Sequence, residues 1–294
     1  MDSHNTTPMS TLRDIKVLHL EPTDVCQAAC PLCIRETDTN FNKQQTHHLS
    51  IKDIFGIIDS EKIARLDKMF MCGDYGDPAA GRHTQKIYRT FRKLNPDIVL
   101  GMNTNGALRK TEWWRDLAKI LHQPRDYVVF SIDGLEDTNH IYRRNVNWRN
   151  LMNNVQAFIA AGGSAHWDML VYRHNQHQVD ACEQLARKLG FSWFRAKVSK
   201  RPFINGLEFP LGWRDPVQQT GSIHCQALQE ASMYIDAQGR EHPCCWLGNT
   251  QKDFVTMAQV QQSWATTPHP VCKQICSSKQ NSFVNQWQRE IQLC

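Results

Sequence analysis

The sequence lacks the features that would assign it to a membrane or secreted class. No apolar run approaches the ~18 residues that a membrane-spanning helix needs. Residues 1–15 are polar and lack the charged-then-apolar pattern of a secretory signal. Internal repeats and low-complexity tracts are absent as well. We therefore expect an intracellular, cytoplasmic protein with no membrane partner, in a compartment that keeps thiols reduced.

Cysteine is abundant by contrast, with 11 residues in a chain of 294. An odd number of cysteines without a secretory signal argues against a disulfide framework and favours metal clusters. The net charge of +5 is mild, so it permits an anionic partner without demanding one. The length suits one large domain with a small appendage.

Three cysteines stand at C-x3-C-x2-C spacing directly after the first strand-like run: Cys26, Cys30 and Cys33. Three thiolates at this spacing can hold three irons of a 4Fe–4S cluster and leave the fourth iron open. Pro31 lies inside the triplet, so we expect a loop around the cluster rather than a regular helix. A structural zinc site needs a fourth ligand, and no other Cys or His lies close by in the sequence.

Residues 16–198 alternate between strand-like and helical patterns. The strand-like runs are 17–22, 68–73, 98–106, 127–134, 167–172 and 191–198, and the helical patterns are roughly 51–65, 83–94, 111–121, 147–161 and 176–189. Repeated βα units predict an α/β fold with a parallel sheet and helices outside it. Folds of this kind place their chemistry at the C-terminal ends of the strands.

The triplet and the strand-end motifs resemble those of the radical SAM superfamily. The turn at 75–78, Tyr-Gly-Asp-Pro, is similar to the Gly-Gly-Glu-Pro stretch of that family, from which Tyr75 and Asp77 depart. Residues 103–106 resemble its TNG segment, and residues 131–134 resemble its S-[IL]-D segment. The resemblance implies a partial (β/α)6 TIM-like barrel that binds S-adenosylmethionine (SAM) at the open iron of the cluster.

The resemblance also implies roles for single residues. Cys26, Cys30 and Cys33 would be the catalytic cysteines that ligate the SAM-binding cluster. The candidates for SAM contacts are Tyr75, Gly76, Asp77, Asn105, Ser131 and Asp133. Lys197, with Arg195 as its alternative, is a candidate for the SAM carboxylate. Turn capping alone also explains Asn, Asp and Gly at such positions.

A second cysteine-rich unit covers residues 225–276. Cys225 is followed by thirteen residues, Gly239, four residues and Cys244, and the stretch between the cysteines predicts a β-hairpin turning at 236–239. This pattern resembles the auxiliary-cluster domain of the SPASM/twitch branch, in its shorter twitch form. The resemblance implies an auxiliary 4Fe–4S cluster held by Cys225, Cys244, Cys272 and Cys276. Cys245 is an alternative to Cys244, Cys294 is an alternative to one of the last pair, and a four-cysteine zinc ribbon is the alternative site.

The chain is thus expected to comprise five parts. These are a flexible N-terminus (1–15), the barrel (16–198), a linker rich in proline and glycine (199–224), the twitch-like unit (225–276) and a terminal helix or tail (277–294).

The resemblance implies an oxidoreductase or isomerase that reductively cleaves SAM to a 5′-deoxyadenosyl radical, which removes hydrogen from a substrate carbon. Its electron donor would be a flavodoxin or ferredoxin. Residues 184–206 contain six bases, no acid and interleaved aromatics, which favours a nucleotide, a nucleic-acid base or another anionic substrate. Only residues 1–15 precede the first strand, which disfavours a peptide-modifying enzyme with a leader-binding domain. That enzyme, a non-catalytic iron–sulfur protein and a zinc-ribbon nucleic-acid binder remain the alternatives.

Overall fold

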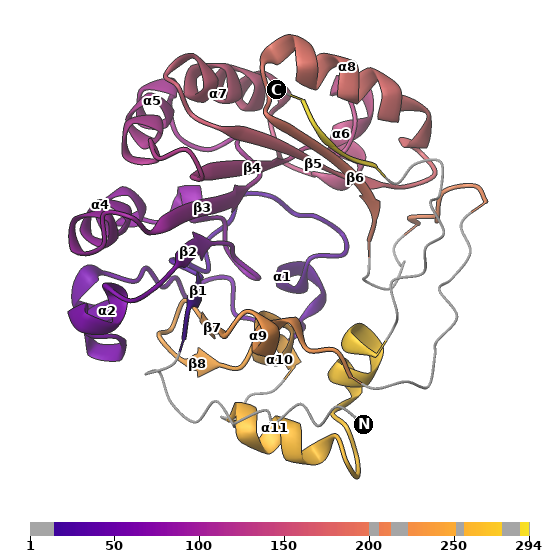
Figure 1. The fold of residues 1–294 in the computed structure, drawn as a ribbon. Helices are drawn as coiled ribbons and strands as arrows, with labels where there is room; N and C mark the ends of the chain where they lie inside the picture. The colour runs from indigo at the N-terminus through magenta and orange to yellow at the C-terminus, as the bar shows by residue number, and fades with distance from the viewer. Residues whose placement is uncertain (1–14, 200–205, 213–222, 251–255, 278–288, 294) are drawn as a thin grey trace.

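The computed structural model describes residues 15–199, 206–212, 223–250, 256–277 and 289–293. Within these ranges one nine-stranded sheet has the order β8-β7-β1-β2-β3-β4-β5-β6-β9. The sheet curves into an open arc with helices on its convex side (Figure 1). This mixed α/β architecture with a parallel core is the one that the βα pattern predicts.

The six parallel strands of the barrel are β1 (Val17–Leu20), β2 (Lys68–Met71), β3 (Val99–Thr104), β4 (Tyr127–Ser131), β5 (Ala165–Val171) and β6 (Trp193–Val198). Three further strands extend the sheet at its edges: β7 (Ser232–Ile235), β8 (Glu241–His242) and β9 (Arg289–Gln292). β7 runs parallel to β1, whereas β8 is antiparallel to β7 and β9 is antiparallel to β6. The second cysteine unit therefore continues the barrel sheet beyond β1.

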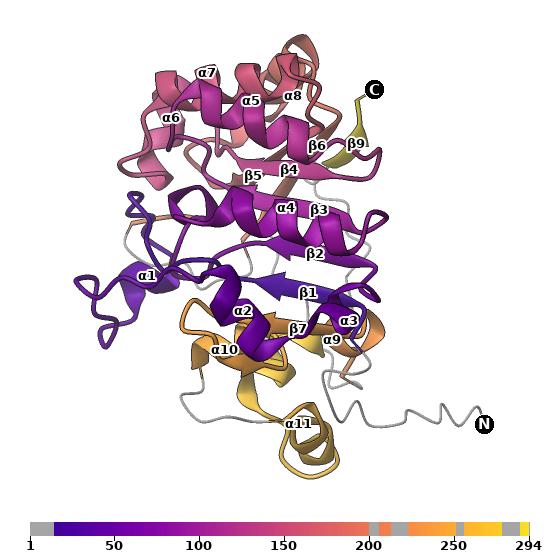
Figure 2. The same cartoon turned by 90° about the vertical axis from the view of Figure 1, so that its left-hand side faces the viewer.

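The outer helices follow the predicted pattern closely. They are α2 (Ile51–Ile57), α3 (Ser60–Ile63), α4 (Thr84–Leu94), α5 (Thr111–Ile120), α7 (Trp148–Ala160) and α8 (Val179–Leu189). Five other helices were not predicted individually: α1 (Ile34–Thr37), α6 (Glu136–Tyr142), α9 (Gln226–Gln229), α10 (Cys245–Thr250) and α11 (Met257–Ser263). Figure 2 shows α2, α4, α5 and α7 covering the outer face, while α1 lies at the end toward which the strands point.

The core lies between the sheet and these helices, because each strand turns alternate side chains outward. Leu20, Met71, Phe130 and Trp167 are fully buried there. Gly190 ends α8 in the left-handed conformation (φ 84°), and its amide donates to the Ala186 carbonyl. A glycine adopts this conformation without the steric cost that a Cβ brings.

The inner face of the sheet carries a layer of aromatic rings. His19 stacks on Phe70 at 4.4 Å between ring centroids, and Tyr127 stacks on His166 at 5.1 Å. β3 contributes Gly101 to this layer, where a Cβ would lie 2.5 Å from Cζ of Tyr127. The absent side chain thus leaves room for the Tyr127 ring.

The C-terminal region differs in part from expectation. The predicted hairpin is present, and the amide of Gly239 donates to the Asp236 carbonyl at 2.9 Å within its turn. The helix predicted for 277–294 is wrong for Arg289–Gln292, which form β9. The open edge of β6 offers backbone hydrogen bonds that outweigh the local helix preference of four residues. Residues 278–288 and 294 lie outside the described ranges, as do most of the predicted linker and N-terminus.

No helix in the described part of the chain is long and apolar enough to cross a membrane.

Candidate functional site

The cysteine triplet lies in the loop that joins β1 to α1. The amide of Cys33 donates to the Cys30 carbonyl at 2.9 Å, so the chain turns tightly around Pro31, and α1 begins only at Ile34. Cys30 is buried, and Cys26 and Cys33 are partly buried. The loop thus holds three thiols at the C-terminal end of the first strand.

Nitrogen donors lie close to the sulfur atoms of Cys26 and Cys30. The amide of Ala28 lies 3.4 Å from Sγ of Cys26, and the Asn105 side-chain amide lies 3.7 Å from the same sulfur. Nη1 of Arg143 lies 3.9 Å from Sγ of Cys30. Burial raises the pKa of Cys26 above its ordinary range and that of Cys30 to about 11. Bound metal cations would be needed to hold such sulfurs as thiolates, and N–H donors suit cluster-ligating thiolates.

The turn after β2 is held against this loop by backbone contacts that leave no space for a side chain at Gly73 or Gly76. A Cβ on Gly76 would lie 1.8 Å from the Thr23 carbonyl oxygen, and one on Gly73 would lie 1.8 Å from the Gly76 carbonyl oxygen. The amide of Asp77 donates to the Val25 carbonyl at 2.9 Å. The close approach explains why the sequence has glycine at both positions.

Glu21, which sequence reasoning missed, fixes the other side of the same turn. Its Oε1 accepts hydrogen bonds from the amides of Tyr75 (2.7 Å) and Gly76 (2.9 Å), and its Oε2 lies 2.5 Å from the Tyr234 hydroxyl. Burial, together with the charge of Asp74, raises the pKa of Glu21 to about 8. Glu21 directly follows β1, so its position at a strand end is the signal that could have identified it.

Asp77 and Asn105, both predicted from the motifs, come into contact. The Asp77 carboxylate accepts hydrogen bonds from the Thr104 hydroxyl (2.8 Å) and from the backbone (2.7 Å) and side-chain (2.6 Å) amides of Asn105. Burial raises the pKa of Asp77. Because Asn105 also reaches Cys26, the ends of β2 and β3 are linked directly to the cysteine loop.

Ser131 is the last residue of β4 and Asp133 follows the strand, and the two residues differ in exposure. Ser131 is partly buried at the strand end, in register with Asp168 of β5. Asp133 has no exposed surface, and its carboxylate accepts from Nε of Arg143 and from the amide of Leu170, both at 2.6 Å. Arg143 was not identified from the sequence, because its contact with the cysteine loop joins residues that are far apart along the chain.

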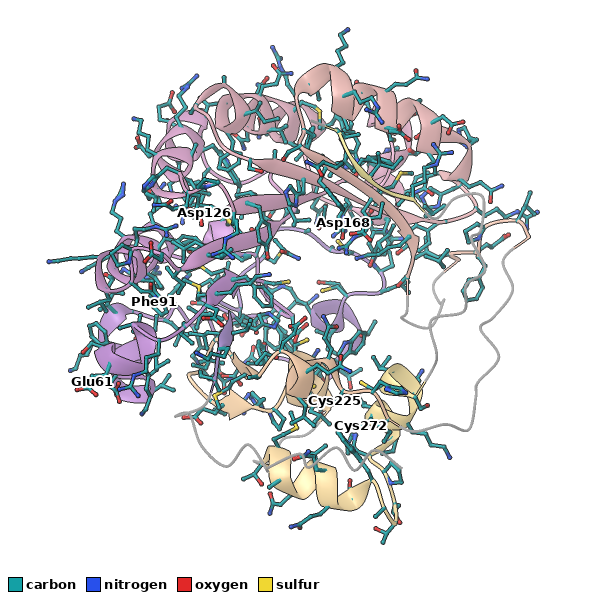
Figure 3. All side chains as sticks on the ribbon, viewed as in Figure 1. Glu61, Phe91, Asp126, Asp168, Cys225 and Cys272 are labelled. Carbon is teal, nitrogen blue, oxygen red and sulfur yellow. The ribbon has the colours of Figure 1, made fainter. Side chains whose placement is uncertain are left out.

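Lys197 lies on the inner side of β6, where it shares a carboxylate with Arg195. Asp168 accepts from Nε and Nη2 of Arg195 (2.5 and 2.8 Å) and from Nζ of Lys197 (2.9 Å). Burial raises the pKa of Asp168, but the hydrogen bonds and charges of the two cations outweigh it and leave the pKa lowered. Figure 3 shows Asp168 beside β5, facing the space enclosed by the sheet. These three residues alone carry one positive charge in excess, and Glu290 of β9, in register with Arg195, adds a negative charge beside them.

The four cysteines predicted for the second unit lie in one region. Burial and then the neighbouring Cys225, Cys272 and Cys276 raise the pKa of Cys244 to about 12. The amide of His224 donates to the Cys276 carbonyl at 2.9 Å, which ties the two ends of the unit together. Figure 3 shows Cys225 and Cys272 near each other below the barrel. The unit has a small hydrophobic cluster of its own, made of Leu247, Val260 and Cys272. Cys244 packs against this cluster.

Cys245 has different neighbours from Cys244. Burial raises its pKa, and the next contributions come from Asp74, Cys244 and Cys72, near the turn after β2. Cys294 lies outside the described residues. Within the described ranges, no three His, Cys, Asp or Glu side chains are close enough together to bind a single metal ion.

A cavity of about 460 Å³ lies between the segment 34–47, which begins with α1, and the β7–β8 hairpin. Its acidic lining residues are Glu21, Asp24, Asp38 and Asp236. The Asp24 carboxylate lies 2.6 Å from Nδ1 of His47, and Asp38 accepts from the Tyr75 hydroxyl at 3.0 Å. The cavity adjoins the turn after β2 through Tyr75, and Asn105 does not line it.

Residues 20–185 match the family model described as the radical SAM superfamily. The match covers more than half of the chain and includes the triplet and all three strand-end motifs, so the chain belongs to the radical SAM superfamily. Membership implies an enzyme that uses a 4Fe–4S cluster and SAM. No curated protein sequence matches the chain significantly.

Solved structures share the fold at low sequence identity. Streptococcus suis SuiB aligns with a TM-score of 0.61 and 14% identity, covering 88% of this chain and 67% of SuiB, and the same values hold for SuiB bound to SAM. The structure of anSMEcpe with bound SAM and the Kp18Cys peptide aligns with a TM-score of 0.58 and 12% identity, covering 85% of this chain and 80% of anSMEcpe. Identities this low establish the likeness of the fold alone.

Proposed function

We propose that Cys26, Cys30 and Cys33 ligate the SAM-binding cluster of this radical SAM enzyme. The observation that carries the proposal is the convergence of three strand ends on the triplet, through the contacts of Asn105 with Cys26 and Asp77. When bound, the cluster supplies the electron that cleaves SAM to a 5′-deoxyadenosyl radical, which removes hydrogen from a substrate carbon. The N–H groups aimed at the Cys26 and Cys30 sulfurs fit this cofactor.

The chain's own residues would position SAM over the open iron. Gly76 lets the turn after β2 lie against the cysteine loop, and Glu21 fixes the amides of that turn. We assign SAM contacts to Tyr75, Gly76, Asn105 and Ser131, and to the backbone carbonyl of Asp77, whose carboxylate is buried and engaged with Thr104 and Asn105. Asp133 would act through Arg143 instead, since its carboxylate is buried and already engaged.

The second unit is proposed to hold an auxiliary twitch-type 4Fe–4S cluster. The grouping of Cys244 with Cys225, Cys272 and Cys276 supports this ligand set, and the different neighbours of Cys245 disfavour the alternative. Four thiolates complete the ligation of such a cluster, so it would transfer electrons without binding substrate. Its separate hydrophobic cluster supports the division of the chain into a barrel and a second unit.

The substrate is proposed to carry an anionic group. The single excess positive charge of the Arg195–Lys197–Asp168 trio faces the barrel interior. The basic and aromatic residues of 184–206 favour a nucleotide or a nucleic-acid base as this anionic substrate. Lys197 is also the candidate for the SAM carboxylate. Because one excess charge neutralises only one anionic group, the substrate and the SAM carboxylate are alternative partners of Lys197. A flavodoxin or ferredoxin is the proposed electron donor, and the reaction is an oxidation or an isomerisation.

A peptide substrate is the second candidate. SuiB has been solved bound to precursor peptide SuiA, at a TM-score of 0.60 and over 88% of this chain, and anSMEcpe has been solved with a bound peptide. The shared fold makes a peptide-modifying activity the alternative to test beside nucleotides.

An iron count on cysteine variants tests both clusters. Reconstituted anaerobically, the wild-type protein should hold about eight irons, four in each cluster. Cys26→Ala/Cys30→Ala/Cys33→Ala and Cys225→Ala/Cys272→Ala should each lose about four. Cys182→Ala is the matched control, because Cys182 is fully buried in the α8 core and should leave the count unchanged. Zinc in the second unit would contradict the auxiliary cluster.

A further inference from the structure

The aspartate after β4 forms a buried ion pair with Arg143. Nε of Arg143 donates to Oδ2 of Asp133 at 2.6 Å, the arginine side chain is 16% exposed, and the aspartate is fully buried. A buried pair of this kind is costly unless its remaining polar atoms are satisfied. The amide of Leu170 satisfies the other carboxylate oxygen at 2.6 Å. This second contact fixes the Asp133 carboxylate, and through it the guanidinium.

The other end of the guanidinium reaches the cysteine loop. Nη1 of Arg143 lies 3.9 Å from Sγ of Cys30, and the ring of Tyr142 lies 5.2 Å from its guanidinium carbon. The backbone is tied at the same place, because the amide of Ala29 donates to the Arg144 carbonyl at 3.0 Å. Arg143 therefore bridges the end of α6 and the cysteine loop in a single orientation.

We propose that Arg143 is a positioning residue that raises the reduction potential of the SAM-binding cluster by donating a hydrogen bond to Cys30. This inference rests on the proposed ligand role of Cys30. Reduction adds negative charge to a cluster and its thiolates, and a cation or N–H donor beside a ligating sulfur stabilises the added charge. Asp133 balances the charge of the guanidinium, but the positive end of the pair is the nearer one to the sulfur.

Burial makes this effect persist in salt. Solvent ions screen exposed charges within a Debye length but reach a buried pair poorly. Arg144, the next residue, is exposed and contributes only its backbone carbonyl to the contact. The two adjacent arginines thus form a matched pair in which one side chain faces the cluster ligand and the other faces solvent.

The test is an EPR-monitored redox titration of the reconstituted holoenzyme. The signal that SAM perturbs identifies the SAM-binding cluster. Arg143→Gln should shift the midpoint potential of that cluster to a more negative value. Arg143→Lys keeps the positive charge but loses the planar set of guanidinium N–H donors, so it should shift the potential less. Arg144→Gln should leave it unchanged. A merely structural role of Arg143 would lower cluster content without moving the potential of the clusters that remain.

Equal midpoint potentials in the wild type and Arg143→Gln would overturn the inference while leaving the proposed function intact. If Arg143→Gln holds no cluster, Arg143→Lys decides, and a wild-type potential in that variant overturns the inference. A wild-type protein without any SAM-responsive signal would overturn both the inference and the proposed function.

Discussion

The buried carboxyl of Glu21 predicts an unusual loss of stability as the pH rises. It is 1% exposed, and burial with the charge of Asp74 raises its pKa from 4.5 to about 8, although hydrogen bonds from Tyr234, Gly76 and Tyr75 partly oppose the rise. Below pH 4.5 the folded and unfolded states are both protonated. Between that pH and about 8 the unfolded chain loses the proton while the folded chain retains it. The contribution of Glu21 to the free energy of unfolding is therefore complete below pH 4.5. It declines as the pH rises, until the folded carboxyl ionises near pH 8.

The magnitude follows from the difference between the two pKa values. Each unit corresponds to about 1.4 kcal/mol, so the complete window corresponds to about 5 kcal/mol as an upper bound. Glu21→Gln removes the titration but keeps the shape of the protonated acid. Its side-chain oxygen still accepts from the amides of Tyr75 and Gly76, and its amide nitrogen donates to the Tyr234 oxygen.

Urea unfolding of the wild type and Glu21→Gln at pH 5, 7 and 8.5 measures the effect. The two proteins should have similar free energies of unfolding at pH 5, and the variant should be the more stable by several kcal/mol at pH 8.5. Glu112→Gln is the control, because Glu112 is exposed and hydrogen bonds lower its pKa, so it stays ionised in the folded protein from pH 5 to 8.5 and should leave the profile in this range nearly unchanged. Parallel pH profiles of the wild type and Glu21→Gln would refute the reasoning.

Two further substitutions test the SAM site. Gly76→Ala places a Cβ 1.8 Å from the Thr23 carbonyl oxygen, so SAM binding measured by calorimetry should be lost. Gly56 has open space around it, so Gly56→Ala should bind SAM normally. Undiminished binding by Gly76→Ala would contradict the assigned role of the turn. Lys197→Gln should weaken SAM binding about tenfold, the loss of roughly one charge-assisted hydrogen bond. The exposed Lys188→Gln on α8 should not weaken it, and equal affinities for all three proteins would remove Lys197 from the SAM site.

The strands and helices of the barrel were predicted well, because the hydrophobic patterns that specify them lie within short stretches of sequence. Strand runs and helical periods at 68–73, 83–94 and 127–134 fall within a few residues of β2, α4 and β4. Gly76 was singled out from the motif as a glycine that would let the backbone approach a ligand, and in the structure a Cβ there would lie 1.8 Å from the Thr23 carbonyl oxygen.

Glu21, Arg143 and β9 depend instead on partners far along the chain. Glu21 meets Tyr234, and Arg143 meets Cys30, across separations that no periodicity encodes. The strand at Arg289–Gln292 forms only because the edge of β6 is open beside it. Buried polar pairs and edge strands are decided by tertiary contacts, so a single sequence does not reveal them.

The central claim is that the Cys26, Cys30 and Cys33 triplet supports cleavage of SAM. Its most direct test is to reduce the anaerobically reconstituted protein, add SAM and quantify 5′-deoxyadenosine, with the triple alanine variant of the triplet in parallel. The wild type should form 5′-deoxyadenosine, and the variant should form none. The claim would be contradicted by a wild type that holds its irons but cleaves no more SAM than the variant, with nucleotides and peptides each added as candidate substrates.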